Sequence, residues 1–108
     1  MNGITTEIVD YGSGVQCKRS YENGILRKEI WLKDEIKNRD DDEPTQIEFY
    51  ENGIIFVSKW YKNGKQHREY DKPAEIYFNK NGIINQEIWF INDVSIREND
   101  LPFNVQYF

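Results

Sequence analysis

Hydrophobic and polar residues alternate along much of this chain, and turn-forming residues interrupt the alternation at regular intervals. The segment "IEFYENGIIFVSKWY", which begins at Ile47, has β-branched and aromatic residues on both sides of Asn52-Gly53. Asn-Gly is a strong hairpin signal because both residues tolerate the positive φ of a tight turn. Alternation with a period of two is typical of half-buried strands, so the pattern predicts antiparallel hairpins and little or no helix.

The hairpin pattern occurs three times, as "YENGILRKEIW" from Tyr21, "YENGIIFVSKW" from Tyr50 and "NKNGIINQEIW" from Asn79, at an offset of 29 residues. Uncommon residue types kept in register over three copies identify an internal repeat, with copies 21–49, 50–78 and 79–108. The residues that recur at this offset are Trp31, Trp60 and Trp89, then Arg39, Arg68 and Arg97, then Asp42, Asp71 and Asp100, and finally Pro44, Pro73 and Pro102.

Each copy has a second turn after its tryptophan, followed by a loop of the form Asp-x-Pro. The second turn is Asp34-Glu35, Asn63-Gly64 or Asn92-Asp93, and we expect the middle one to be the tightest because it contains glycine. Proline lacks the N–H that a β-ladder needs, so it marks a corner before the next strand. The prediction is one all-β domain, an antiparallel meander with about three strands per copy. Residues 1–20 lack both tryptophan and Asp-x-Pro and are predicted to be a degenerate β cap of two short strands.

The expected pairing assigns side chains to the two faces of the sheet. With a two-residue turn, Ile47 pairs with Ser58 and Phe49 pairs with Phe56, which places Trp60 on the face of Ile47 and Phe49. We therefore expect the repeated tryptophans to stack into a ladder that forms the core.

The opposite face is not cleanly polar, since the middle copy places Tyr50, Ile55 and Tyr61 there. Two interpretations follow. Either the curled sheet and its own loops cover this face, or it is an aromatic contact surface for a partner.

The composition and net charge narrow the classes of function to be considered. The chain has 108 residues, a net charge of −5 and 15% aromatic residues, which is typical of one small folded domain and unfavourable for general binding to nucleic-acid phosphates. Residues 21–49 hold nine acids against five bases, and the run Asp40, Asp41, Asp42, Glu43 contributes most of the excess. Such a run is either a solvated loop or an acidic patch that attracts a basic partner.

Candidate chemistry is sparse. The single cysteine, Cys17, allows neither an intrachain disulfide nor a cysteine-based zinc site, and it indicates a reducing compartment. With no leader-like or membrane-spanning stretch, we expect a cytoplasmic protein. His67 is the only histidine, and its counterparts are Asn38 and Ile96, so we interpret it as structural rather than as a general base. No catalytic residue, metal site or cofactor is expected.

The repeated arginine and aspartate are three residues apart in every copy. We expect a clasp at each corner, in which the arginine binds backbone carbonyls and the aspartate binds backbone N–H groups before the proline. Residues outside the repeat pattern are the candidate partner contacts, namely Asp40, Asp41, Asp42 and Glu43 with the aromatic anchors Tyr61 and Phe90. The alternating stretch "FNVQYF" is a candidate edge strand through which a homodimer could form.

The middle copy carries Trp60, Tyr61, Asn63-Gly64-Lys65, His67-Arg68 and the Asp-x-Pro-Ala that ends at Ala74. This signature resembles the MORN-type variant repeats, also described as YwqK-like antitoxin repeats. The resemblance covers about residues 21–107, with departures in the first copy at Asp34-Glu35 and Asn38 and in the third at Asn92-Asp93, Ile96 and Phe103.

The resemblance implies repeated antiparallel hairpins, a surface that contacts proteins or, in the broader MORN group, lipid head groups, and neither enzymatic activity nor a cofactor. We therefore expect a non-enzymatic protein-binding module, an inhibitor, antitoxin or immunity-type protein of a bacterial or phage conflict system that blocks a basic partner protein. The alternative is a structural module that assembles through its sheet edges.

Overall fold

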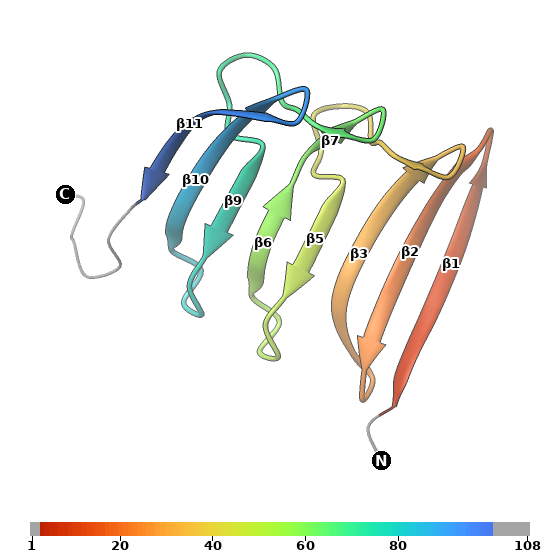
Figure 1. Cartoon of the computed structure of the whole chain (residues 1–108). Helices are drawn as coiled ribbons and strands as arrows, with labels where there is room; N and C mark the ends of the chain where they lie inside the picture. Colours follow the sequence, from red (N-terminus) through yellow and green to blue (C-terminus); the bar gives the residue numbers. More distant parts are fainter. Residues whose placement is uncertain (1–2, 101–108) are drawn as a thin grey trace.

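The computed structural model describes residues 3–100, which form a long antiparallel β-sheet and contain no helix (Figure 1). This confirms the predicted all-β meander. The sheet order is β1-β2-β3-β5-β6-β9-β10-β11, with β4 paired to β3, while β7 and β8 form a separate small hairpin. The strands are β1 (Ile4–Gly12), β2 (Val15–Glu22), β3 (Ile25–Lys33), β4 (Ile36–Lys37), β5 (Gln46–Phe49), β6 (Ile55–Lys59), β7 (Tyr61–Lys62), β8 (Lys65–Gln66), β9 (Glu75–Phe78), β10 (Ile84–Ile91) and β11 (Val94–Asp100).

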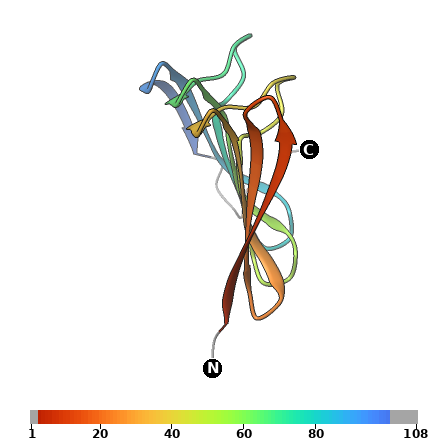
Figure 2. The ribbon, with the colours of Figure 1, turned by 90° about the vertical axis from the view of Figure 1, so that its right-hand side faces the viewer.

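The sheet is a single curved layer, as the view from its edge shows (Figure 2). Its upper end divides into two rows. The turns after β3, β7 and β10 lean to one side, and the loops between β4 and β5 and between β8 and β9 lean to the other (Figure 2). We call these two loops, residues 38–45 and 67–74, the corner loops.

Few side chains are buried in a single layer. The buried ones are Cys17, Val57, Ala74 and Trp89, with the polar Thr45, Gln46, Ser58 and Glu75. The predicted core, a ladder of three tryptophans, is therefore only partly correct, because Trp89 is 8% exposed whereas Trp31 and Trp60 are half-buried. Among residues 3–100 no second layer covers the indoles, so local contacts at the corners must do so.

The lower turns are of two kinds. Between β2 and β3, both Asn23 (φ 52°) and Gly24 (φ 81°) have positive φ, as expected for a two-residue Asn-Gly turn. In the second and third copies only the glycine has positive φ, at Gly53 (87°) and Gly82 (84°). The Asn-Gly pairs of these two copies therefore belong to wider loops.

The wider loop changes the register of β5 and β6. Ile47 lies opposite Ser58 as predicted, but Phe49 lies opposite Ile55 rather than Phe56. One extra residue of β6 is accommodated there as a bulge. Instead of pairing with Phe49, the Phe56 ring packs edge-on against Tyr50 and Tyr77.

The three second turns are alike, so the prediction that the middle one is the tightest is wrong. Each joins strands through two residues with positive φ: Asp34 (50°) and Glu35 (68°), Asn63 (51°) and Gly64 (83°), Asn92 (47°) and Asp93 (70°). Acidic residues evidently adopt this conformation here without glycine.

The N-terminal segment forms a hairpin of two strands, which are longer than the short strands expected there. β1 and β2 have nine and eight residues, and they meet at a tight turn containing Ser13 (φ 55°) and Gly14 (φ 80°). β2 pairs with β3 as β5 pairs with β6 and β9 with β10, so it takes the place before the first copy that β5 and β9 take before the next two.

The third copy differs from the first two at its corner. β11 runs straight along β10, with Arg97 opposite Trp89. Asp100 ends β11 and only its backbone is described. Pro102 and the predicted edge strand "FNVQYF" lie outside the described residues.

Candidate functional site

Each repeated arginine covers the indole of its own copy. The guanidinium carbons lie 4.1, 3.8 and 3.8 Å from the ring centroids in the pairs Arg39–Trp31, Arg68–Trp60 and Arg97–Trp89. Such stacking is a favourable cation–π contact. In the two corner loops the same arginines donate to proline carbonyls, Arg39 to Pro44 and Arg68 to Pro73, both at 3.0 Å. The expected bond from arginine to a backbone carbonyl is thus present.

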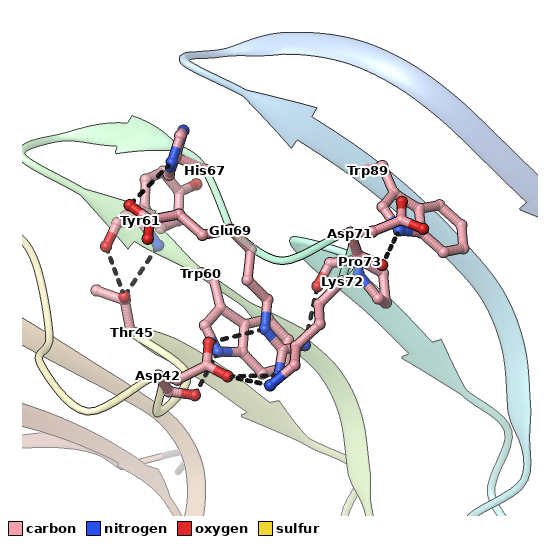
Figure 3. Close-up of polar contacts among 11 residues, drawn as sticks. Asp42, Thr45, Trp60, Tyr61, His67, Glu69, Asp71, Lys72, Pro73 and Trp89 are labelled. Atoms are coloured by element: carbon pink, nitrogen blue, oxygen red, sulfur yellow. Dashed lines mark hydrogen bonds and ion pairs between the residues drawn. The ribbon is translucent and has the colours of Figure 1, made fainter.

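Asp42 does not act as expected, because it binds side chains of the next copy instead of backbone N–H groups before Pro44 (Figure 3). Its carboxylate accepts hydrogen bonds from Arg68 at 2.9 and 3.3 Å and from Lys72 at 2.8 Å. Its backbone carbonyl accepts a hydrogen bond from Nε1 of Trp60 at 2.9 Å. Asp42 therefore joins the first copy to the second.

The same link joins the second copy to the third. The carbonyl of Asp71 accepts a hydrogen bond from Nε1 of Trp89 at 3.1 Å, and its carboxylate lies 3.4 Å from Arg97. Trp31 has no preceding Asp-x-Pro loop, and its Nε1 donates instead to Glu29 at 3.0 Å. We call the contact of an aspartate with the tryptophan and arginine of the following copy the aspartate link.

The aspartate link predicts an acid-dependent loss of stability. The hydrogen bond from Arg68, aided by that from Lys72, lowers the pKa of the Asp42 carboxyl against the opposing effect of burial. Because the pKa is lower in the folded than in the unfolded chain, the stabilisation is complete above the unfolded value of about 3.9 and disappears as the pH falls through the folded value. Asp42→Asn should lower the free energy of unfolding by about 1 kcal/mol at pH 7, since its side chain is 40% exposed and solvent screens the pairs.

Chemical denaturation of wild type and Asp42→Asn at several pH values tests this prediction. The difference between them should shrink as the pH falls below about 4. Asp41→Asn is the matched control, because Asp41 is exposed and has no ion-pair partner among residues 3–100. A difference that stays constant into strong acid, or that Asp41→Asn reproduces, would contradict the assignment.

His67 is a second connection between copies. Its Nδ1 accepts a hydrogen bond from the backbone N–H of Asn92 at 3.2 Å. Asn38 does the same in the first copy, where its Oδ1 accepts from Asn63 N–H at 2.9 Å. Asparagine and histidine differ in size, but each offers an acceptor at the δ position, and this common property was the signal missed in the sequence.

This hydrogen bond predicts that His67→Ala lowers the free energy of unfolding, whereas His67→Asn leaves it nearly unchanged. Alanine removes the acceptor and should cost about 1 kcal/mol, while asparagine restores the group that the first copy uses. Denaturant titrations give the stabilities, and hydrogen exchange at the Asn92 amide reports the contact itself. Faster Asn92 exchange in both variants would show that the acceptor is not what matters.

The corner loops enclose a hollow of about 260 Å³ beside the middle copy. It brings together four of the predicted contact residues, Asp40, Asp41, Asp42 and Tyr61, and adds Glu69 and Tyr70. Glu43 faces an adjoining hollow, which it shares with Asp40 and Asp41. Phe90 lines neither of these two hollows: it lies on β10, half-buried, and its carbonyl accepts from the Arg68 backbone N–H.

The aromatic residues here differ in accessibility. The Tyr61 ring lies under the Lys37 ammonium group at 4.6 Å, and burial raises the pKa of its phenol. Tyr70 is instead 83% exposed at the tip of a corner loop, with φ of 64°. An aromatic residue with positive φ is uncommon. Tyr70 is a candidate contact that the sequence analysis missed, since it follows the arginine at a position without a repeated residue type.

The acidic residues of the first corner loop differ in whether they form ion pairs. Asp40, Asp41 and Glu43 are exposed and form no ion pair within the described part of the chain. Asp42 is held by Arg68 and Lys72. Three acids on one corner loop therefore present unneutralised charge.

A metal site, a membrane-spanning helix and a reactive thiol have little support in residues 3–100. No three His, Cys, Asp or Glu side chains there converge as a metal site would require, and no helix there could span a membrane. Cys17 is fully buried, and burial raises the pKa of its thiol, which disfavours the reactive thiolate. No protein-family model matches the chain, and neither a curated protein nor a solved structure matches it.

Proposed function

We propose that this chain is a non-enzymatic protein-binding repeat module whose corner loops contact a basic surface of a partner protein. The observation that supports this most is the group formed by Asp40, Asp41 and Glu43, which are exposed and form no ion pair within residues 3–100, together with the exposed ring of Tyr70, which lines the same hollow as Asp40 and Asp41. We call these four residues the acidic corner surface. An inhibitor, antitoxin or immunity-type protein would use such a surface to block its target.

Two physical features suit the acidic corner surface to this task. A cluster of like charges on a chain of net charge −5 accelerates the encounter with a basic partner, and an exposed tyrosine can anchor the contact. The loops that carry these residues are also fixed before binding. Arg39 binds Pro44 O and Arg68 binds Asp42, so less conformational entropy is lost when a partner docks.

The resemblance to the MORN-type variant repeats, or YwqK-like antitoxin repeats, points the same way. We propose membership of that group on the residues Trp60, Tyr61, His67, Arg68 and Asp71. Their contacts link one copy to the next, which is what a repeat family would be expected to retain.

A charge-reversal experiment tests the proposal. The chain is immobilised and exposed to a lysate of its source cells, beside two variants of equal net charge. One is Asp40→Lys/Asp41→Lys in the acidic corner surface, and the other is Glu35→Lys/Glu51→Lys at exposed positions elsewhere. We expect one stoichiometric basic protein on the wild type and the control, and at least tenfold less on the corner variant. Capture of no stoichiometric protein, or equal loss from both variants, would refute the proposal.

A further inference from the structure

Within residues 3–100, β1 forms one edge of the sheet. Among these residues it is the outermost strand in the order of the sheet and pairs only with β2 (Figure 1). Natural edge strands are usually protected by charged side chains, proline, a bulge or a short length. β1 has nine residues, and from Ile4 to Val9 it has no proline, no bulge and a single charged side chain, Glu7. Ile4 and Ile8, on one face of this strand, are 71% and 57% exposed.

The hydrogen-bonding groups at this edge follow from the pairing with β2. Gly3 is on the bonded side, because its carbonyl accepts from the N–H of Asn23 at 2.8 Å. Bonded and free residues alternate along an antiparallel strand. The backbone N–H and C=O groups of Ile4, Thr6 and Ile8 therefore point away from β2.

These three residues form a self-complementary set. If two copies meet through β1 about a two-fold axis at Thr6, Thr6 lies opposite Thr6 and Ile4 lies opposite Ile8 of the second copy. The six free N–H groups then find six carbonyls, and two Ile–Ile contacts cover the exposed side chains. On the other face Glu7 lies opposite Thr5, so no like charges meet. Centring the pair on Glu7 instead would place two carboxylates in direct contact.

We propose that the chain forms a homodimer by antiparallel pairing of β1 with β1 of a second copy, centred on Thr6. The two sheets then become one continuous sheet. The two-fold axis places the acidic corner surfaces of the copies at opposite ends of the joint sheet. Dimerisation therefore leaves both surfaces free and does not depend on the proposed function.

Sedimentation over a wide concentration range tests the dimer. We expect the mass to approach twice the 13.0 kDa of one chain as concentration rises. Thr6→Pro removes a central donor that β2 does not use, and Thr6→Lys places two positive charges opposite each other. Both should weaken the dimer about tenfold or more while leaving circular dichroism unchanged, and Thr6→Val should not. A monomer at every concentration, or a dimer unaffected by both variants, would overturn the proposal.

Disulfide trapping tests the register. Residues opposite each other in a bonded antiparallel pair have Cα atoms about 5.5 Å apart, within the usual span of a disulfide. With oxidised glutathione as oxidant, Thr6→Cys should form a cross-linked dimer, whereas Thr5→Cys, whose partner is Glu7, should not. Cys17 is fully buried and does not compete. Equal cross-linking of the two variants, or none in Thr6→Cys, would contradict pairing centred on Thr6.

Discussion

Replacing Trp89 with alanine is expected to lower the free energy of unfolding by about 3–5 kcal/mol, the largest effect of any single substitution proposed for this chain. Trp89 is the most buried of the three indoles, at 8% exposure. Its removal would leave a cavity, strip the ring from under Arg97 and delete the hydrogen bond to the carbonyl of Asp71. Urea or guanidinium titration gives the measurement.

Two variants separate these contributions. Trp89→Phe keeps an aromatic ring for Arg97 but removes the indole donor, so it should cost less, about 1–2 kcal/mol. Trp31→Ala should also cost less than Trp89→Ala, because Trp31 is half-buried and its Nε1 binds a side chain of its own copy. If Trp89→Ala cost no more than Trp31→Ala, the link between the second and third copies would carry little stability.

Thr45→Val is expected to cost about 2–3 kcal/mol although the two side chains have nearly the same shape. Thr45 is fully buried at the end of the first corner loop, directly before β5. Its hydroxyl accepts from the N–H of Tyr61 at 2.9 Å and donates to the carbonyl of the same residue at 3.1 Å (Figure 3). Valine would leave the backbone N–H and C=O of Tyr61 without the hydroxyl partner. Tyr61 lies just after Trp60, the residue between β6 and β7.

Thr45→Ser is the control, because it keeps the hydroxyl and loses only a methyl group. It should cost about 1 kcal/mol, and the valine variant should cost more. Equal costs for the two would show that Thr45 acts through packing and not through its hydroxyl. Thermal or chemical denaturation of the two variants side by side decides between these outcomes.

The sequence was sufficient to predict the architecture because the signals for it are local. Alternation along each strand and Asn-Gly between strands define hairpins within some fifteen residues, and the offset of 29 residues shows that the hairpins recur. The same reasoning misjudged the lower turns of the later copies. At Asn52 the side-chain oxygen accepts from the N–H of Ile54 at 3.0 Å, and this local bond accompanies the wider loop.

The contacts between copies could not be predicted from the sequence, for a different reason. The repeat places an aspartate three residues after every arginine, so Asp42 has an equally plausible partner in its own copy and in the next. Periodicity alone cannot distinguish Arg39 from Arg68, which is identical in type and 29 residues further on. The structure shows that the partner is Arg68.

The predicted core failed in part because alternation identifies faces but not what covers them. Three tryptophans on one face suggested a shared interior, yet residues 3–100 form one layer and each indole is covered by an arginine. The acidic corner surface was predictable only in its charged part. Asp40 and its neighbours are visible as a run of acids, whereas Tyr70 lies in a loop, where no periodicity indicates exposure.

The central claim is that consecutive copies are joined by the aspartate link. Nuclear Overhauser contacts from the indole N–H groups test it most directly. The Trp60 indole proton should show contacts to Asp42, and the Trp89 indole proton should show the same contacts to Asp71, each across 18 residues of sequence. Indole protons with unrelated neighbours, or with contacts only inside their own copy, would contradict the account.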